Sequence, residues 1–493
     1  MVSIGLCAAL KKRGHVVQPF KKGPDYIDPM WLTQASGRAC RNLDLYLMEH
    51  EEIVSTFVQH SADINLVEGN KGLYDGLALD GSNSNAALAK LLDLPVFLVI
   101  DARGMTRGIA PLILGYQAFD RDIDIAGVIL NNLGGSRHEA KLRAVIEHYT
   151  DVPVIGAIHH DEQLGIIERH LGLMPSNESA AAAEKIQKIG EIIEKQVELD
   201  RLLALSQKSP LEIPHKAGFK AIPFVGKVRI GVARDQAFGF YYADDIDALV
   251  ASGAEIVPFD TLNDARLPDV DALYIGGGFP EVFAAGLEKN GALRNEIKQA
   301  IADGMPVYAE CGGLMYLSRS ITYQGSSYQM VGAIPGDVKM HDKPIGRGYV
   351  HLAENADHPW PRPEASPLPN PLNEATSHST TLQKAAAKSL VIPQAGEGAN
   401  VKSNYKILAH EFHYSSLENL PPDSRFAYQV ARGHGINGKQ DGLILNNLLA
   451  SYTHLRTIGS CYWASRFVAF IQQTKMQHAG QTIRATAYIN IFA

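Results

Sequence analysis

The chain has 493 residues, of which 46% are hydrophobic and 20% are charged, and these proportions are ordinary for a folded globular protein. Its length predicts two large domains. The formal net charge of -7 is spread along the chain without a dense basic run, which argues against a nucleic-acid partner. Because no apolar stretch reaches the roughly 20 residues of a membrane span and the N-terminus lacks a signal-peptide pattern, we expect a cytoplasmic protein without a membrane partner.

The N-terminal half alternates short apolar runs with helix-length stretches. Strands are predicted at Ile64–Glu68, at Val96–Asp101, and at residues 125–130 and 154–158. This alternation is typical of a parallel sheet covered by helices on both faces, with ligand-binding loops after the strands. From residue 176 to about residue 208 the composition predicts one long helix rich in Ala, Glu, Lys and Leu.

A Pro-interrupted stretch then separates two predicted domains. We expect an α/β domain over residues 1–205, a linker over residues 206–226 and a second α/β domain over residues 227–475. The second domain repeats the strand signals, at Val228–Ala233, residues 255–259, Ala272–Ile275 and residues 306–308. Residues 353–404 are rich in Pro, Gly, Ser and Asn and predict an exposed insertion.

Cys311 is the candidate nucleophile among four scattered cysteines that form no CxxC pair. The run MPVYAECGGLMYL, residues 305–317, places it directly after an apolar strand and before two glycines that open an amphipathic helix. A tight turn between strand and helix lifts a side chain clear of the sheet, and a helix N-terminus favours a thiolate. A buried core thiol is the commoner state of a cysteine, so the residue type alone does not decide.

A thiolate that attacks the side-chain amide of glutamine needs an oxyanion hole and a general base. Gly312 follows the nucleophile, and Gly277 lies in the glycine-rich run IGGGFPE after the preceding strand, so these two are the predicted oxyanion donors. His454, in ASYTHL, and His413, in AHEFHYS, are both candidates for the base. Their spacing alone does not choose between them.

Carboxylates and lysines gather in the N-terminal half in runs rich in glycine. Asp25, Asp28 and Glu68 are suited to hold Mg²⁺ at nucleotide phosphates, although helix capping or turn formation is the commoner role of an Asp in such places. Lys21 can neutralise phosphate or substrate carboxylates. Asp44 belongs to the expected cleft.

Ten motifs in order resemble the cobyrinic acid a,c-diamide synthase family, which consists of tetrapyrrole amidotransferases. In the C-terminal half these are GVARDQAFGFYY, ALYIGGGFPE, YAECGGLMYL, AHEFHYS and ASYTHL. In the N-terminal half they are QPFKKGPDYIDP, GRACRNLDLY, LVEGNKGLYDG, VIDARGMTRG and ERHLGLMP. The resemblance implies that Cys311 is the glutaminase nucleophile and His454 its base. Since Arg456 stands where related glutaminases carry an acid, it implies a Cys–His dyad.

The same resemblance implies a fold and a reaction. It implies an N-terminal P-loop-like parallel-sheet amidoligase domain and a C-terminal class I-type glutaminase α/β domain, with ATP and Mg²⁺ as cofactors. Lys21, Asp25, Asp28 and Asp44 would bind ATP or substrate, and Glu68 would lie at the metal. The reaction would be amidation of the a and c acetate carboxylates of cobyrinic or hydrogenobyrinic acid in cobalamin biosynthesis, with glutamine as nitrogen donor and an acyl phosphate as intermediate.

Alternative functions stay open at this point. Another tetrapyrrole polycarboxylate, nickel sirohydrochlorin or sirohaem, would suit the same chemistry, as would a cobyric acid synthase-like activity, against which the runs GPDYIDP and HEFHYS count. A non-catalytic relative is the alternative from another class. The sequence is compatible with a homo-oligomer and does not fix the oligomeric state.

The beginning of the chain departs from the family pattern. The family has a strand and a glycine-rich P-loop-like run ending in GK[ST]T, whereas this chain starts with MVSIGLCAALKKRG, which resembles the helix that follows such a loop. A strand and loop of that kind occupy roughly 15 to 20 residues, which we expect to be encoded upstream.

Overall fold

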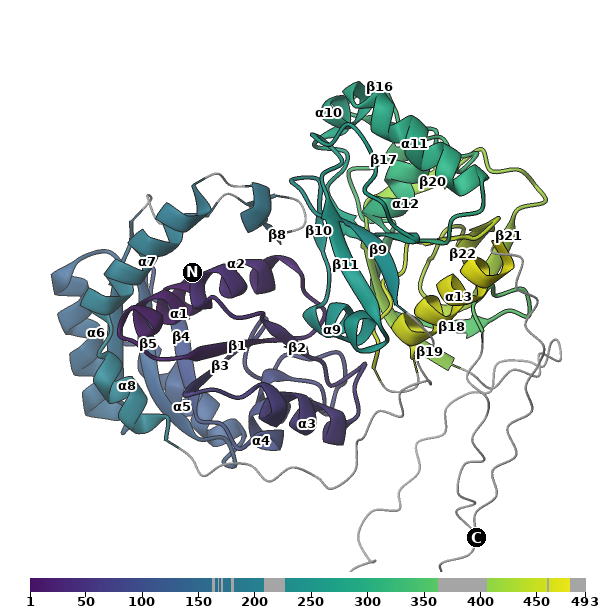
Figure 1. The fold of residues 1–493 in the computed structure, drawn as a ribbon. Helices are drawn as coiled ribbons and strands as arrows, with labels where there is room; N and C mark the ends of the chain where they lie inside the picture. Colours follow the sequence, from purple (N-terminus) through teal and green to yellow (C-terminus); the bar gives the residue numbers. More distant parts are fainter. Residues whose placement is uncertain are drawn as a thin grey trace, which may run out of the picture.

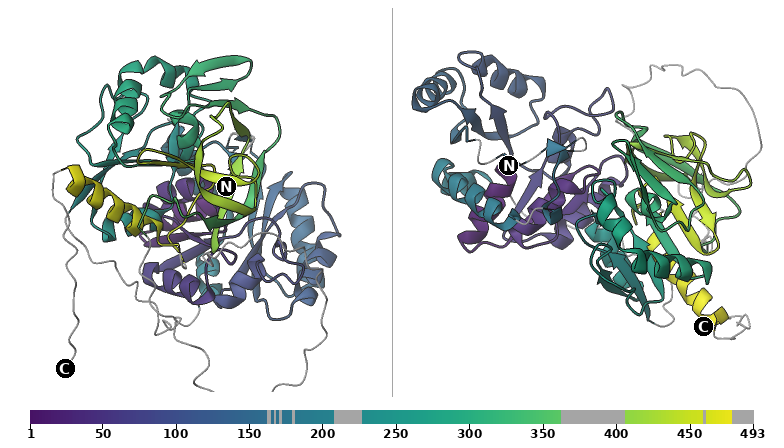
Figure 2. Two further views of the ribbon diagram at one scale, coloured as in Figure 1. Left: turned by 90° about the vertical axis from the view of Figure 1, so that its right-hand side faces the viewer. Right: turned by 90° about the horizontal axis from the view of Figure 1, so that it is seen from above.

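The computed structural model describes residues 1–161, 165–166, 168–169, 172–178, 181–207, 227–361, 406–458 and 461–478. These residues form two α/β halves that lie side by side and meet near helices α2 and α9 (Figures 1 and 2). The predicted linker and the very C-terminus fall largely outside the described residues.

The N-terminal half is built around two three-stranded parallel sheets. One has the strand order β2-β1-β3 and the other the order β4-β5-β6. Its elements are α1 (Val2–Lys12), β1 (Val17–Lys22), α2 (Ile27–Ser36), β2 (Arg41–Leu43), α3 (His50–His60), β3 (Ile64–Glu68), α4 (Asn85–Leu91), β4 (Val96–Asp101), α5 (Ile109–Phe119), β5 (Ile125–Leu133), α6 (Ser136–Tyr149), β6 (Val154–His159), β7 (Glu168–Arg169), β8 (Gly172–Leu173), the 3₁₀ turn η2 (Ser176–Glu178), α7 (Ala182–Gln196) and α8 (Leu199–Leu205).

Two details of the N-terminal half differ from the prediction. The expected single sheet is divided, because β3 and β4 share no hydrogen-bonded ladder. The expected long helix is also interrupted, because Val197 adopts an extended conformation and forms a β-bridge with Gly156 of β6. Apolar packing of α7 against α1 therefore ends at Gln196, and α8 starts in a new direction.

The C-terminal half is a nine-stranded mixed sheet with the order β11-β9-β12-β14-β23-β22-β21-β18-β19, together with a small four-stranded sheet. Its elements are β9 (Val228–Ala233), β10 (Phe238–Phe240), α9 (Ala243–Ala251), β11 (Ala254–Phe259), β12 (Ala272–Ile275), β13 (Gly277–Gly278), α10 (Ala284–Lys289), α11 (Gly291–Ala302), β14 (Val307–Glu310), α12 (Gly312–Leu317), β15 (Ser320–Tyr323), β16 (Ser326–Gln329), β17 (Asp337–Met340), β18 (Gly346–Glu354), β19 (Lys406–His413), β20 (Ser415–Glu418), β21 (Arg425–Arg432), β22 (Gln440–Leu445), β23 (Leu448–Ser451) and α13 (Trp463–His478).

Alternate side chains of the central strands enter two cores. On one face of the sheet, Leu273 and Val307 pack with helices α10, α11 and α12, and on the other, Tyr274 and Tyr308 pack with α9 and α13. The parallel strands β9, β12 and β14 end beside one another, which brings the loops that follow them to one edge of the sheet.

The predicted insertion begins later than residue 353. Ala353 and Glu354 belong to β18 and pair with β19 and β21. Trp360 is buried against Tyr308 and Phe467, because its indole fills the core beneath α13. The remainder of the predicted insertion, from residue 362, lies outside the described residues.

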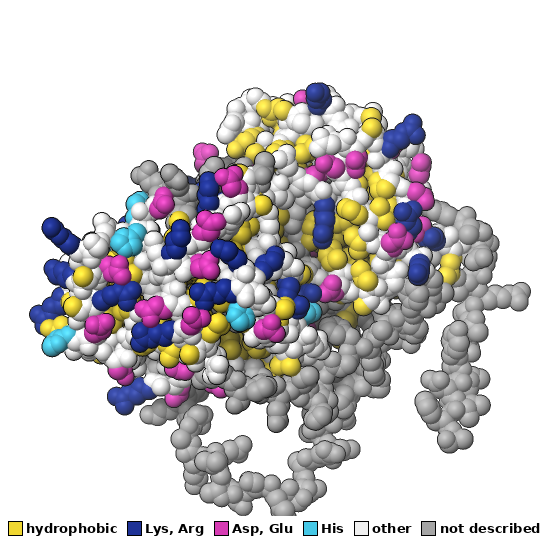
Figure 3. All heavy atoms as spheres, turned by 60° about the vertical axis from the view of Figure 1, so that its left-hand side comes forward, with side chains coloured by type: hydrophobic (Ala, Val, Ile, Leu, Met, Phe, Trp, Pro, Cys, Tyr) yellow, Lys and Arg dark blue, Asp and Glu magenta, His cyan; other side chains and the backbone are white. Residues whose placement is uncertain are grey.

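The surface agrees with the spread of charge along the sequence, which has no dense basic run. On the face drawn in Figure 3, Lys and Arg side chains are interspersed with Asp and Glu side chains over the N-terminal half. No helix among the described residues is long and apolar enough to cross a membrane.

Candidate active site

Cys311 lies at the sharp turn between β14 and α12. Its backbone has φ 46° and ψ −100°, a conformation that is strained for a residue other than glycine. The strain is held in place because the Cys311 N–H donates to the carbonyl of Ser451 at 2.7 Å and the Cys311 carbonyl accepts from Met315. Gly313 has no room for a Cβ atom, which would lie 2.0 Å from the Ile275 carbonyl oxygen, so glycine is required directly after this turn.

The other three cysteines are ordinary core thiols. Burial raises the pKa of Cys7 and of Cys461 to about 12 and raises that of Cys40 well above its usual value. Such thiols stay protonated and unreactive near neutral pH. Cys311, by contrast, lines a cavity.

His454 lies next to Cys311 and to a carboxylate that the sequence analysis missed. Burial lowers the pKa of His454, but interaction with the neighbouring Cys311 and Glu310 and their negative charge outweigh burial and raise this pKa to about 10. The Nδ1 atom of His454 is 3.6 Å from Oε2 of Glu310. The arrangement thus supports an imidazolium beside a thiolate, with an acidic partner behind the imidazole.

Glu310 is itself held firmly within the core. Its carboxylate accepts hydrogen bonds from the hydroxyls of Tyr308 (2.5 Å) and Tyr274 (3.0 Å) and from the N–H of Leu455 (2.9 Å). The side chain is only 1% exposed. Glu310 thus places a carboxylate beside His454, although it comes from the nucleophile's own strand.

Two further histidines, His410 and His413, line the same cavity, and both already contact neighbouring residues. His413 donates from Nδ1 to the carbonyl of Ser415 at 2.8 Å, and its Nε2 lies 3.7 Å from Oε2 of Glu411. His410 exchanges backbone hydrogen bonds with His454 and stacks on its ring at 5.0 Å. Burial lowers the pKa of His410 well below its usual value, with help from the charge of His454, so His410 stays neutral.

The glycine-rich loop after β12 packs against the nucleophile turn. A Cβ atom on Gly312 would lie 3.0 Å from the backbone nitrogen of Gly278, so the two backbones approach each other closely. A Cβ atom on Gly277 would lie 2.7 Å from the imidazole of His454. Both predicted oxyanion glycines are thus adjacent to the reacting pair, and Gly278 lines the cavity beside Cys311.

In the N-terminal half, Lys21 draws together three of the predicted carboxylates. Its ammonium lies 2.5 Å from Asp28, 2.8 Å from Glu68 and 3.6 Å from Asp25. Burial lowers the pKa of Lys21, but the three carboxylates raise it above its ordinary value. Burial and the charge of Asp28 raise the pKa of Asp25 to about 6.

The oxygen donors around Lys21 suit Mg²⁺ in kind. Within the described residues, no group of three or more His, Cys, Asp or Glu side chains has the arrangement of a formed metal site. The ammonium of Lys21 lies where the carboxylates converge, so any cation that binds them has to share them with this lysine.

Asp44 does not join the Lys21 cluster. Its carboxylate accepts from the hydroxyl of Tyr349 and from the N–H groups of Tyr46 and Leu47, and it is 1% exposed. Since Tyr349 belongs to the C-terminal half, the hydrogen bond that Asp44 accepts from it connects the two halves.

Arg456 fastens the same junction. Its guanidinium is fully buried, donates to the carbonyl of Asn42 and to Asp244, each at 3.2 Å, and lies 4.4 Å above the ring of Tyr242. The position that carries an acid in related glutaminases is therefore used here for contact between the halves.

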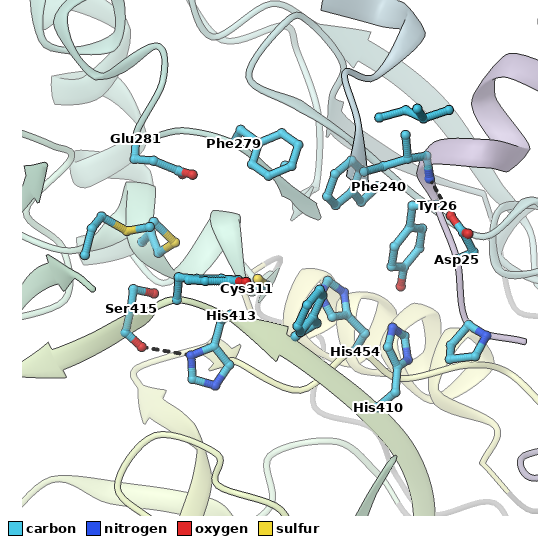
Figure 4. Close-up of a pocket in the computed structure, with 18 of the residues that line it drawn as sticks. Asp25, Tyr26, Phe240, Phe279, Glu281, Cys311, His410, His413, Ser415 and His454 are labelled. Atoms are coloured by element: carbon cyan, nitrogen blue, oxygen red, sulfur yellow. Dashed lines mark hydrogen bonds between the residues drawn. The ribbon is translucent and has the colours of Figure 1, made fainter. Parts of the chain in front are cut away.

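One cavity of about 560 Å³ joins the two sets of predicted residues (Figure 4). It is lined by Cys311 and His454 from the C-terminal half and by Asp25 and Asp28 from the N-terminal half. The sequence analysis missed several residues of this site: Tyr26, Phe240, Phe279, Glu281, Glu310 and His410. All six stand inside quoted motifs, and a charge within an otherwise apolar strand was the available signal for Glu310.

Family models match both halves of the chain. A family model described as a CobB/CobQ-like glutamine amidotransferase domain matches residues 229–460, and an AAA domain model matches residues 25–167. A solved glutamine amidotransferase from Thermotoga maritima is 10% identical, covers 52% of this chain and 86% of its own, and has a TM-score of 0.29.

Curated relatives span nearly the whole chain and share one name, cobyrinate a,c-diamide synthase. The protein of that name from Magnetococcus marinus is 42% identical and covers 95% of this chain and 93% of its own length. The proteins from Methanosarcina acetivorans and Archaeoglobus fulgidus are 43% and 40% identical and cover 93% and 95% of this chain, and 89% and 93% of their own. By this similarity over both halves, the chain belongs to the cobyrinate a,c-diamide synthase family of glutamine-dependent amide ligases.

Proposed function

We propose that the protein amidates the a and c acetate carboxylates of cobyrinic acid, or of hydrogenobyrinic acid, with glutamine and ATP, in cobalamin biosynthesis. The observation that carries this proposal is the shared cavity, in which a thiol–imidazole pair from one half faces a lysine–carboxylate cluster from the other. The names of the relatives supply the substrate. We place the reaction in the cytoplasm, where both ATP and glutamine are available.

In the glutaminase half, the Cys311 thiolate attacks the side-chain carbonyl carbon of glutamine. The oxyanion accepts hydrogen bonds from backbone N–H groups at Gly277 and Gly312, and the His454 imidazolium gives its proton to the departing nitrogen, so that ammonia and a thioester form. His454 then takes a proton from water as the water attacks the thioester, which releases glutamate and restores the thiol. Glu310 keeps the imidazole oriented and favours its charged form.

In the ligase half, a substrate carboxylate attacks the γ-phosphorus of ATP, and ADP leaves. Ammonia then attacks the acyl carbon, phosphate leaves, and the amide remains after loss of a proton. The first step brings the negative charges of the carboxylate and the triphosphate together, which Lys21 relieves through its ammonium group. Glu68, with Asp25 and Asp28, would hold Mg²⁺, which when bound neutralises phosphate charge. We assign Asp44 a part in shaping the cleft through Tyr349.

The direct test is an assay of the purified protein with glutamine, MgATP and a panel of tetrapyrroles. We expect a diamide from cobyrinic or hydrogenobyrinic acid, with two ATP molecules used for each product, and mass spectrometry counts the amides. Nickel sirohydrochlorin and sirohaem complete the panel. Preferred amidation of either of these would overturn the proposed substrate, and glutamine hydrolysis with no amide from any tetrapyrrole would overturn the proposed ligase reaction.

A further inference from the structure

Tyr26 lies between the two reaction sites: its backbone belongs to the turn at the Lys21 cluster and its ring contacts His454. Its main chain lies in the turn between Asp25 and Asp28, where Oδ1 of Asp25 accepts from the N–H groups of Ile27 (2.9 Å) and Asp28 (3.2 Å). This turn is tied to Lys21 through both carboxylates. A change at the lysine cluster therefore acts directly on the backbone that carries Tyr26.

The side chain of Tyr26 leaves the N-terminal half and enters the glutaminase half. Its ring stacks parallel to that of Phe240 at 5.3 Å and packs on Tyr242 at 4.5 Å. The ring centroid is 5.1 Å from that of His454. Figure 4 shows the Tyr26 ring between Asp25 on one side and the histidine pair on the other.

His454 depends on such packing for its orientation. Its imidazole is enclosed by the rings of Tyr26 and His410 and by Gly277, where a Cβ atom would collide with it. Its Nδ1 lies just beyond hydrogen-bond distance of Glu310, at 3.6 Å, so a small displacement decides whether that bond closes. A shift of the Tyr26 ring changes the packing that the N-terminal half supplies to His454.

We infer that Tyr26 is a positioning residue that couples occupancy of the Lys21 carboxylate cluster to the alignment of His454, so that glutamine is hydrolysed fastest when the ligase site is filled. Bound phosphates compete with Asp25 and Asp28 for Lys21, and a divalent cation competes with Lys21 for the two carboxylates, so either ligand resets the turn. The coupling acts through ring contact, because the buried Tyr26 hydroxyl has no hydrogen-bond partner among the described residues. The inference rests on the proposed function, which names ATP and a tetrapyrrole carboxylate as the occupants.

The test is the rate of glutamate release with and without MgATP plus cobyrinic acid. In the wild type we expect stimulation of at least about fivefold, within the range of ordinary coupling between sites. Tyr26→Leu, which removes the ring, should bring this ratio close to one, whereas Tyr26→Phe should keep it within about twofold of the wild type because only the unbonded hydroxyl is lost. Tyr46→Leu is the matched control, since Tyr46 also packs across the junction, on Tyr349 at 4.1 Å, but does not touch His454.

Several results would overturn the inference. These are an unstimulated wild type, full stimulation in Tyr26→Leu, loss of stimulation in Tyr26→Phe, or an equal loss in Tyr46→Leu. Amide formation is measured in parallel on the wild type. If no amide forms with any tetrapyrrole, the proposed function fails, and the inference is then judged by the same ratios with MgATP alone.

A binding measurement completes the test without turnover. Coupling between sites is reciprocal, so glutamine bound to the inactive Cys311→Ala protein should tighten MgATP binding by a factor of the same size as MgATP tightens glutamine binding. Calorimetry should find this factor in Cys311→Ala and not in the double variant Cys311→Ala/Tyr26→Leu. Equal factors in both proteins would contradict a role for the Tyr26 ring.

Discussion

Glu310, whose carboxylate lies beside His454, directly precedes Cys311 in the sequence. Glu310 ends β14 with its carboxylate turned into the core, whereas Cys311 starts the turn with its thiol turned into the cavity. The sequence could predict Cys311 and His454 as site residues because their motifs are specific. It could not identify Glu310, because the pairing of an acid with a histidine 144 positions away is created by β14 and β23 lying side by side.

Cys311→Ala should abolish glutamine-dependent amidation and leave amidation with a high concentration of ammonium salt, because only the supply of nitrogen needs the thiol. Amide formation is assayed with each nitrogen source. Loss of both activities in a folded variant, or of neither, would contradict the assignment of the nucleophile.

His454→Ala should lower glutamine turnover by at least about 100-fold, the effect expected from removing a general acid–base group. His413→Ala is the comparison, and it should cost less, because His413 already donates to the carbonyl of Ser415. Glutamate release by the two variants gives the order. A larger loss in His413→Ala would transfer the role of the base to that residue.

Glu310→Gln should move the alkaline limit of glutaminase activity to lower pH. The pKa of His454 is raised to about 10 by Cys311 and Glu310 against the effect of burial, so removing the negative charge of Glu310 lowers it. The imidazolium that protonates the leaving nitrogen is then lost at a lower pH. The measurement is the pH profile of kcat/KM for glutamine, with Tyr274→Phe as a control that keeps the carboxylate. An unchanged alkaline limb would exclude Glu310 as the acidic partner.

At the scale of elements, the pairing of β1 with β3 builds the ligase cluster. The ladder places Lys21 directly opposite Glu68, and α2 begins just after Asp25, so the lysine and the three carboxylates converge from different segments. The sequence analysis grouped these residues by chemistry alone and did not list β1 as a strand. A strand that carries two lysines and a proline lacks the apolar run by which the other parallel strands could be predicted.

Glu68→Gln should impair amidation equally with glutamine and with ammonium salt, because the phosphoryl-transfer step is common to both. The ratio of the two rates, measured against the wild type, should stay near one, while glutamine hydrolysis by itself is retained. A variant that loses only the glutamine-dependent activity would place Glu68 in communication between the halves instead.

Strand prediction succeeded for parallel strands of mainly apolar sequence and failed for the antiparallel strands. The strands β9, β12 and β14 are mainly apolar and almost entirely buried, which a sequence reveals directly. By contrast, β18 alternates buried and exposed residues and includes Arg347 and His351, so its end was assigned to the insertion. Its identity depends on partners on both sides, β19 and β21, that come later in the chain.

At the scale of the molecule, the junction contains a buried positive charge. Arg456→Gln should lower the free energy of unfolding by about 3 kcal/mol or more, because the carboxylate of Asp244 and the carbonyl of Asn42 lose a buried partner. Denaturant unfolding, followed by tryptophan fluorescence, should then resolve the two halves as separate transitions. A single transition at the wild-type midpoint would contradict this account of the junction.

The contacts of Arg456 and Asp44 also bear on whether halves can be exchanged between proteins. A glutaminase half transferred to a different ligase partner would carry Arg456 and Tyr349 into a junction that has to supply their acceptors. Each mismatch buries a polar group without a partner, so sequence similarity within either half does not by itself make a hybrid viable. In a designed chimaera of this family, residues 41–46 of the N-terminal half therefore have to come from the same parent protein as residues 349–351 and 456 of the C-terminal half.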